Sequence, residues 1–198
     1  MGKKLLISQI IKNNIETKEK ILNNQEIISL IEKSAEEIIS ALKNGNKVLL
    51  CGNGGSAADA QHIAAELSGK FYLDREPLFA EALHTNTSFL TAVANDYSYE
   101  EVFTRAVRAM AKKGDVLIAI STSGNSPNII KAIETANKLK MITVGLTGES
   151  GGKMTGLCKY LIKVPSTDTP RIQEAHILIG HIICEIVEKK MFPLRITN

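Results

Sequence analysis

Two histidines and a glutamate are spaced so that two helices could bring them together. His62 and Glu66 lie four residues apart in an alanine-rich segment, so on a helix they share one face. Gln173 and His181 lie eight residues apart near the end of the chain, a little over two helical turns. Two imidazoles, a carboxylate and an amide oxygen form a site for zinc or a similar divalent ion if these helices pack together.

Spacing alone leaves a simpler alternative open, because any two helices supply polar residues at such intervals. His181 stands between Gly180 and Ile182 in an apolar run, where a polar group needs a partner. That partner is either a metal ion or an ordinary hydrogen-bonding group in the core. Of the other histidines, His84 ends an expected strand and is interpreted as structural. His176 is either structural or supports the candidate ligands from behind.

Residues 121–126, Ser-Thr-Ser-Gly-Asn-Ser, are the second segment with chemical potential. The segment follows an apolar run and opens a helix, and it contains four hydroxyls and a flexible glycine. A phosphate dianion is bound by several neutral donors and by the positive end of a helix. A helix cap needs only one hydroxyl, at Ser126, so four hydroxyls favour a phosphate site over a simple turn. The segment lacks the Lys-Ser/Thr ending of a Walker loop.

A glycine-rich turn precedes the helix that carries His62. Residues 48–51 are a short apolar run typical of a buried strand, and Gly52-Asn53-Gly54-Gly55 then lets the chain turn sharply and approach a ligand. Ser56 is the predicted N-cap of a helix that ends at Gly69. Strand, turn and helix N-terminus offer N–H groups to an anion. An anion site beside a His/Glu pair indicates catalysis on a phosphorylated small molecule.

The elements that position these segments alternate between strands and helices. Further strands are expected at 78–83, 116–121, 142–146 and 160–164. Further helices are expected at 87–95, 99–113, 126–140 and 171–190. This alternation predicts an α/β fold with a doubly wound, five-stranded parallel sheet. Both candidate loops then lie at the carboxyl ends of strands, where such sheets bind ligands.

Residues 5–42 have the pattern of an amphipathic helical arm with a break at Asn23-Asn24. The apolar stripe of the arm must be covered by its own domain or by another subunit. A contact between subunits is favoured, because a doubly wound domain already covers its sheet with its own helices. We therefore expect an N-terminal oligomerisation arm, residues 1–36, and one globular domain, residues 37–198.

The bulk composition excludes several classes of protein. The chain of 198 residues is long enough for one α/β domain with a full core. Its net charge of +3 gives no electrostatic case for nucleic acid. The apolar runs are too short to cross a membrane, and the three cysteines form no CxxC and are expected to be buried thiols. These features predict a cytoplasmic protein with no nucleic-acid or membrane partner.

Four motifs together resemble those of the bacterial phosphoheptose isomerases, members of the sugar isomerase (SIS) domain superfamily. They are CGNGGSAADAQHIAAEL from residue 51, VANDY at 93–97, GDVLIAISTSGNSPNI at 114–129 and RIQEAHILIGHI at 171–182. The resemblance extends from about residue 37 to the end, and the helical arm fits as well. It implies a homotetramer of flavodoxin-like SIS domains, in which the N-terminal helices form a central bundle and the sites lie between subunits.

The resemblance also implies roles for particular residues. One zinc ion per subunit would be held by His62, Glu66, Gln173 and His181. The sugar phosphate would be bound by Asn53, Gly54, Gly55, Ser56, Glu66, Asn95, Asp96, Ser121, Thr122, Ser123, Ser126 and Gln173. Two positions depart from the family pattern: Lys70 stands where many members have arginine, and the acid expected close to the RIQ motif is Asp168. The role of Asp168 therefore stays open.

The implied reaction converts D-sedoheptulose 7-phosphate to D-glycero-D-manno-heptose 7-phosphate, the first step of nucleotide-activated heptose biosynthesis for lipopolysaccharide or capsule. It would pass through an enediol(ate), with Glu66 and His181 as the catalytic acid/base groups. One alternative is a non-enzymatic SIS tetramer that binds the bacterial replication initiator, although that group does not keep Glu66 and His181. The other alternative is an isomerase of a different phosphosugar.

Overall fold

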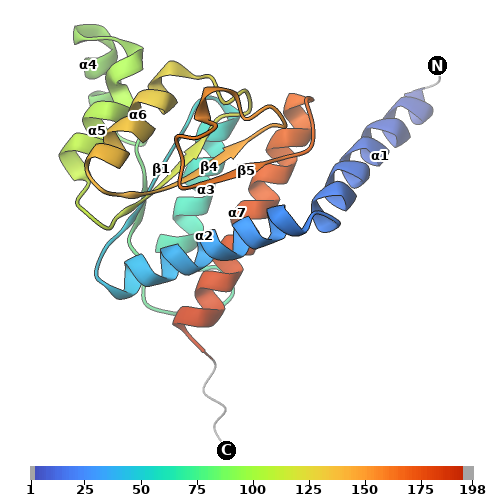
Figure 1. Ribbon diagram of the computed structural model, residues 1–198, viewed down its shortest axis with the longest axis horizontal. Coiled ribbons are helices and arrows are strands. Elements are labelled where there is room, and N and C mark those ends of the chain that lie inside the picture. Colours follow the sequence, from blue (N-terminus) through green and yellow to red (C-terminus); the bar gives the residue numbers. More distant parts are fainter. Residues whose placement is uncertain (1–2, 194–198) are drawn as a thin grey trace, which may run out of the picture.

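A five-stranded parallel sheet forms the centre of the molecule (Figure 1). The structure is a computed structural model that describes residues 3–193. Its strands are β1 (Val48–Gly52), β2 (Ala80–Ala82), β3 (Val116–Ile120), β4 (Ile142–Thr147) and β5 (Tyr160–Lys163). Their order in the sheet is β2-β1-β3-β4-β5, and all neighbouring strands are parallel. The predicted doubly wound sheet is confirmed.

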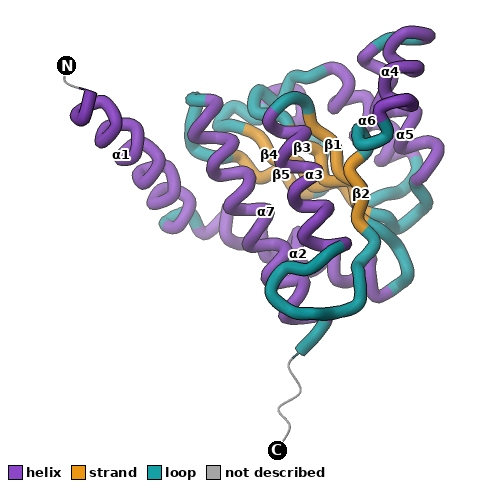
Figure 2. The backbone as a smooth tube through the Cα atoms, turned by 180° about the vertical axis from the view of Figure 1, so that it is seen from behind, coloured by secondary structure: helices purple, strands orange, loops and turns teal. Residues whose placement is uncertain are grey.

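Helices cover both faces of this sheet (Figure 2). One face carries α2 (Gln25–Lys43), α3 (Gly55–Ser68) and α7 (Thr169–Met191). The other carries α4 (Thr87–Asp96), α5 (Val102–Met110) and α6 (Pro127–Lys138). Two short 3-10 turns complete the connections, η1 (Tyr99–Glu101) and η2 (Gly152–Met154). None of the described helices is long and apolar enough to cross a membrane.

The central strands are apolar throughout because both of their faces are covered. Every residue of β1 and of β3 is buried, as expected of parallel strands inside an α/β protein. Successive side chains of a strand point to opposite faces. Leu50 and Ile118 therefore belong to the core under α2, α3 and α7, whereas Leu49 and Leu117 belong to the core under α5 and α6.

The second half of the N-terminal arm belongs to the globular core. Ile27, Ile31 and Ile38 are buried on α2 and contribute to the core that α7 and the sheet share. Asn24 caps this helix by accepting hydrogen bonds from the N–H groups of Glu26 and Ile27. The apolar stripe of α2 is thus covered by its own domain. The boundary expected at residue 36 falls inside this helix.

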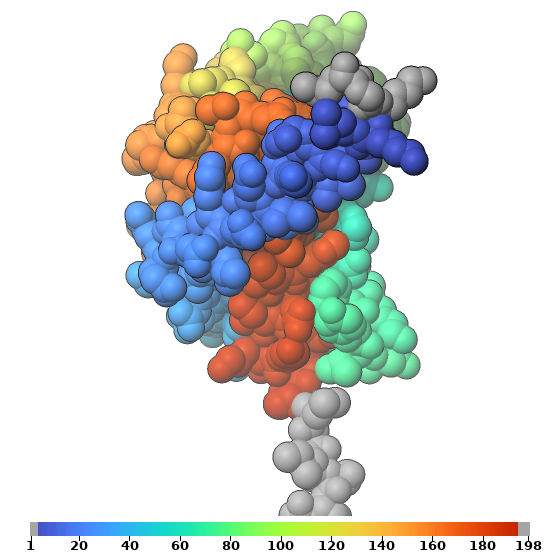
Figure 3. Space-filling model, turned by 90° about the vertical axis from the view of Figure 1, so that its right-hand side faces the viewer, coloured from blue at the N-terminus to red at the C-terminus, as the bar shows by residue number. Residues whose placement is uncertain are grey.

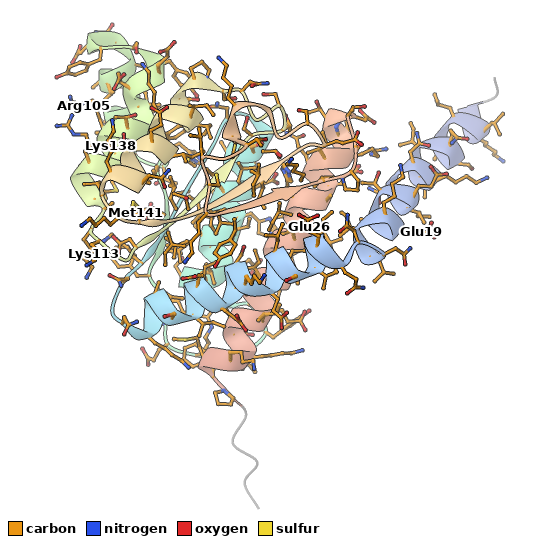
Figure 4. All side chains as sticks on the ribbon, in the orientation of Figure 1. Glu19, Glu26, Arg105, Lys113, Lys138 and Met141 are labelled. Atoms are coloured by element: carbon orange, nitrogen blue, oxygen red, sulfur yellow. The ribbon has the colours of Figure 1, made fainter. Side chains whose placement is uncertain are left out.

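The first helix of the arm, α1 (Lys3–Leu22), buries Ile21 in the core but leaves its other described leucines and isoleucines exposed on the single chain. They are Leu5, Leu6, Ile7, Ile10, Ile11, Ile15 and Leu22. The helix reaches away from the sheet: Glu19 on α1 and Arg105 on α5 lie at opposite sides of the molecule (Figure 4). The break between the two arm helices at Asn23 and Asn24 is where the sequence predicted it.

Two expected helix boundaries were wrong for identifiable reasons. Ser56 lies inside α3, because Gly54 is the N-cap, with φ of 55° and ψ of −122°. That backbone conformation is essentially restricted to glycine. The helix expected over 99–113 ends at Met110, and the N–H of Lys112 then donates to Oδ2 of Asp115 at 2.8 Å. This side-chain acceptor offers the backbone an alternative to another helical turn.

Candidate functional site

His62, Glu66 and His181 come together between α3 and α7 within one chain. Nε2 of His62 lies 3.0 Å from Oε1 of Glu66 and 3.3 Å from Nε2 of His181. One ligand atom from each residue lies within 4.8 Å of the other two. The space-filling view shows α7 directly beside α3 and the segment that follows it (Figure 3).

The close approach of the two helices depends on Gly180. A Cβ atom at this position would lie 2.5 Å from Cδ1 of Ile63. Gly180 precedes His181 and Ile63 follows His62, so the residues that let the helices touch are the neighbours of the two histidines. A small residue at a helix contact thus explains why the two imidazoles meet.

The separations within this cluster match those of ligands around a metal ion. Zinc–nitrogen bonds of about 2.0–2.1 Å place the corners of a tetrahedron about 3.3 Å apart. Nε2 of His62 lies at 3.3 Å from Nε2 of His181 and at 3.0 Å from the Glu66 carboxylate. The His62 and Glu66 side chains are 49% and 23% exposed, so the cluster is open to solvent. The residues present therefore fit a divalent ion of the zinc type.

The side chain of Gln173, on α7, lies against Gly55, the first residue of α3, next to the glycine turn. A Cβ atom at Gly55 would lie 2.3 Å from Nε2 of Gln173, so glycine is required there for the amide to approach. Three of the four predicted ligands form a cluster. The fourth, Gln173, contacts the N-terminus of α3, about two helical turns before His62. Gln173 connects the metal-type cluster with the glycine turn.

The loop of residues 121–126 joins β3 to α6, and the side chain of its last serine does not cap the helix. Ser126 occupies the N-cap position of α6 but makes no side-chain capping bond. Its Oγ atom lies 3.2 Å from Oγ of Ser121. Gly124 has a φ of 65°, and a Cβ there would lie 2.1 Å from the carbonyl oxygen of Gly151. The loop is therefore held in shape by its neighbour, and the N-terminus of α6, whose N-cap serine makes no capping bond, can accept an anion.

The glycine turn and the hydroxyl loop are neighbours because β1 and β3 are neighbours. The two strands pair up to Gly52 and Ile120, their last residues. The strand order reverses between β1 and β3, the position at which open α/β sheets bind ligands. Both loops thus lie at the carboxyl edge of the sheet, on either side of the position where sheets of this kind bind ligands.

Asn95 and Asp96 lie at the end of α4. Nδ2 of Asn95 donates to Oδ1 of Asp96 at 2.9 Å, and no described contact joins either side chain to the His/Glu cluster. The next turn does reach the glycine turn, since the hydroxyl of Tyr99 donates to Oδ1 of Asn53 at 3.0 Å. The described contacts therefore do not bring these two predicted binding residues into the His/Glu cluster.

The remaining candidates have simpler settings. His176 is fully buried, and its Nε2 lies 3.2 Å from the carbonyl oxygen of Thr147. Burial lowers the pKa of His176 to about 4, despite the opposing effect of the Thr147 carbonyl. Lys70 is exposed after α3, and Asp168 is the N-cap of α7 without a side-chain capping bond. A neutral buried histidine is a structural residue, as one of the two interpretations had it.

Two groups that shape the site were not predicted from the sequence. Asn128, in the first turn of α6, pairs with Asn53 across the two loops. Arg75 and Glu188 form a buried ion pair that ties the end of α3 to α7. The only signal for Glu188 was an acid beside the apolar Val187, which a solvated helix face would also show.

Comparisons with known proteins agree with this geometry. A family model described as the SIS domain matches residues 11–148. A phosphoheptose isomerase 2 of Campylobacter jejuni is 59% identical over 91% of this chain and 90% of its own length. The phosphoheptose isomerase of Aneurinibacillus thermoaerophilus is 56% identical over 94% of each chain. A solved phosphoheptose isomerase from Neisseria gonorrhoeae superposes with a TM-score of 0.89 at 41% identity, covering 95% of this chain and all of that one.

Proposed function

Because the chain belongs to the SIS-domain family of phosphoheptose isomerases, we propose that it converts D-sedoheptulose 7-phosphate to D-glycero-D-manno-heptose 7-phosphate. This is an aldose–ketose isomerisation and the first step toward a nucleotide-activated heptose. The observation that carries the proposal is the convergence of His62, Glu66 and His181 on the helices that flank the hydroxyl loop and the glycine turn. Phosphate binding and proton transfer then belong to one site.

The phosphate end of the sugar is assigned to the loop of residues 121–126. Its hydroxyls donate to the phosphate oxygens, and the N-terminus of α6 adds the positive end of a helix. Asn95, Asp96 and the glycine turn are assigned to the sugar itself. Binding energy from the phosphate holds the reacting carbons in place, which lowers the entropic part of the barrier.

Proton transfer is assigned to Glu66 and His181. Glu66 removes a proton from C1 of the ketose and returns it to C2, with an enediol(ate) between the two steps. His181 moves the proton between the two substrate oxygens on the opposite side. His62 lies 3.0 Å from the Glu66 carboxylate and orients it.

His62, Glu66 and His181 would also hold one zinc ion, with Gln173 as the fourth ligand on the family resemblance. When bound, the ion supplies a Lewis acid for the substrate oxygens. Glu66 cannot be a tight ligand and a free base at the same moment, so either its carboxylate would leave the ion during turnover or the ion would only organise the site.

The exposed stripe of α1 is assigned to a subunit contact in a homotetramer. An apolar stripe that its own domain leaves uncovered needs a partner, and the exposed leucines and isoleucines of α1 form such a stripe. The oligomerisation arm is thus narrowed from residues 1–36 to α1, because α2 belongs to the core. The cytoplasm is the assigned compartment, since Cys51, Cys158 and Cys184 are unpaired thiols.

The test is incubation of the purified protein with D-sedoheptulose 7-phosphate in deuterated water. We expect an aldoheptose 7-phosphate that carries deuterium at C2. Glu66→Gln should abolish both product and exchange, whereas the control Glu185→Gln, on the exposed side of α7, should retain them. Exchange that persists in Glu66→Gln would exclude Glu66 as the base. Absence of any product from the wild-type protein would favour the non-enzymatic scaffold.

A further inference from the structure

Asn53 and Asn128 form a reciprocal pair of side-chain amides between the two loops of the site. Nδ2 of Asn53 donates to Oδ1 of Asn128 at 3.0 Å, and Nδ2 of Asn128 donates to Oδ1 of Asn53 at 2.9 Å. Asn53 follows the last residue of β1, and Asn128 is the second residue of α6. The pair is a direct link between the glycine turn and the helix that begins at the hydroxyl loop.

The orientation of both amides is fixed by a backbone donor. The N–H of Ile129 donates to Oδ1 of Asn128 at 3.0 Å, and a backbone N–H can only donate. This identifies the oxygen end of Asn128, which in turn requires Asn53 to present its nitrogen there. The reverse arrangement of either side chain would set two donors or two acceptors against each other.

Tyr99 adds a third partner from the turn that follows α4. Its hydroxyl donates to Oδ1 of Asn53 at 3.0 Å, so this oxygen accepts two hydrogen bonds and both of its lone pairs are used. Asn128 is only 2% exposed, and hydrogen bonds in such a setting are stronger than in water. The side-chain oxygen of Asn53 is thus bound by protein donors and is not free for a substrate hydroxyl.

These three side chains lie beyond the region that the sheet itself holds. The backbone pairing of β1 with β3 ends at Gly52 and Ile120, one residue before Asn53. Past that point the chain continues into the glycine turn after β1 and into the hydroxyl loop after β3. Asn128 comes two residues after Ser126, so fixing Asn128 also fixes the start of α6 and the hydroxyls beside it.

We propose that Asn53, Asn128 and Tyr99 form an amide clasp that sets the spacing between the hydroxyl loop and the glycine turn. The clasp holds the two loops so that one phosphosugar reaches both at the same time. Asn128 and Tyr99 are therefore positioning residues, and Asn53 acts through them. The sugar part of this inference rests on the proposed function, whereas its phosphate part does not.

A double-mutant cycle on inorganic phosphate tests the clasp without any turnover. Asn53→Ala, Asn128→Ala and the double variant are compared by calorimetric titration with phosphate. Either single change should weaken phosphate binding about tenfold, and the double variant should bind no more weakly than the worse single one, because the pair is already lost. Additive losses, or wild-type binding by Asn128→Ala, would overturn the clasp. So would a wild-type protein that does not bind phosphate.

Conservative variants separate positioning from folding. Asn128→Asp keeps the shape and the acceptor for Ile129 but sets a carboxylate oxygen against Oδ1 of Asn53. We expect a KM for sedoheptulose 7-phosphate raised at least tenfold, with a smaller fall in kcat and a cooperative unfolding transition. Tyr99→Phe should raise KM two- to threefold, and Tyr97→Phe, the matched control whose ring stacks on Arg105 at 4.1 Å, should not. A fall in kcat with unchanged KM would contradict the clasp.

Failure of the clasp and failure of the proposed function give different results. A wild-type protein that binds phosphate but forms no aldoheptose phosphate refutes the isomerase, and the phosphate cycle still decides the clasp. An active isomerase with additive phosphate losses keeps the function and refutes the clasp.

Discussion

Two polar bridges connect α7 with α3 and the segment that follows α3, and their settings are opposite. The cluster of His62, Glu66 and His181 lies partly in solvent, with imidazole nitrogens 3.3 Å apart. The second bridge is the ion pair in which Nε of Arg75 donates to Oε1 of Glu188 at 3.0 Å, and these side chains are 3% and 2% exposed. The open bridge thus joins α3 to α7, and the closed bridge joins α7 to the segment that follows α3.

Every described partner of the closed bridge is a protein group. Oε2 of Glu188 accepts from the N–H groups of Tyr72 at 2.9 Å and Leu73 at 3.2 Å. Burial raises the pKa of Glu188, but these N–H groups and the Arg75 guanidinium lower it by more, and the net pKa lies below the usual value. Arg75 also donates to the carbonyl of Glu66 at 2.9 Å, so the closed bridge holds the end of the helix that carries the open one.

The difference in burial between the two bridges indicates that they have different roles. A charged group whose hydrogen bonds are all made by the protein fixes a geometry and has no capacity left for a ligand. In the open bridge two ring nitrogens lie 3.3 Å apart, and the exposed His62 side chain lets a ligand reach them from solvent. The closed bridge holds the helix end in place, and the open bridge is the candidate site.

The largest effect is expected from breaking the closed bridge. Arg75→Met leaves the Glu188 carboxylate buried without its cation, which should cost about 3–5 kcal/mol of the free energy of unfolding. Urea unfolding at pH 7.5 measures it, with Arg108→Met on the exposed face of α5 as a control that should change little. A loss below about 1 kcal/mol would place the Arg75–Glu188 pair with ordinary surface pairs and remove the contrast.

A second test measures how the buried histidine of α7, His176, makes stability depend on pH. The pKa of His176 is about 4 in the folded chain, against an ordinary value of 6.5. Between these values the unfolded state binds more protons, so stability falls as the pH falls, by roughly 3 kcal/mol when the change is complete. His176→Gln, which keeps a donor for the Thr147 carbonyl, should reduce this loss when unfolding is measured at pH 7.5, 6 and 5.

Protonation of Asp59 changes the stability in the opposite direction, so its contribution must be separated from that of His176. Burial raises the pKa of Asp59 to about 6 from 3.8, although the nearby charge of His62 opposes the shift. Its folded state therefore binds more protons, which favours folding at low pH and is lost as the pH rises toward 6. This contribution is present in both proteins, so the difference between wild type and His176→Gln isolates the histidine. Equal slopes would show that His176 is not a buried neutral group.

A third test asks whether the open bridge binds a metal ion. Zinc at about one hundred times its dissociation constant should stabilise the folded chain by about 2.7 kcal/mol, and a chelator should reverse the gain. His62→Ala/His181→Ala should show no gain, whereas the control His84→Ala should keep it. The readout is the thermal midpoint with and without zinc, which requires no catalytic activity. Equal stabilisation of the double variant would place the ion elsewhere.

The sequence was sufficient for the sheet because its signals are local. The runs at 48–51 and 116–121 are apolar and are bounded by turn residues, and both became buried strands. The start of α3 was misplaced because the conformation of Gly54 is set by the turn and not by the neighbouring serine. The sequence could not show that the apolar stripe of α2 packs on its own domain, since a stripe does not specify what packs on it.

The candidate site, too, could be predicted from the sequence only in part. The shared face of His62 and Glu66 follows from their spacing, but their contact with His181 requires that α3 and α7 approach closely at Gly180. Asn128 was missed because its partner becomes adjacent only when β1 and β3 lie side by side. Glu188 was missed because burial, which the sequence does not record, distinguishes it from other acids of the same helix.

The smallest effect should come from an exposed ion pair on the same helix. Nζ of Lys189 lies 2.6 Å from Oε1 of Glu185, and the two side chains are 70% and 37% exposed. Lys189→Met should leave the urea midpoint within measurement error, because solvent screens an exposed pair and the side chains lose entropy in forming it. This pair is shorter than the Arg75–Glu188 contact of 3.0 Å. If Lys189→Met nevertheless cost as much stability as Arg75→Met, distance and not burial would determine the strength of ion pairs on α7, and the closed bridge would lose its special role.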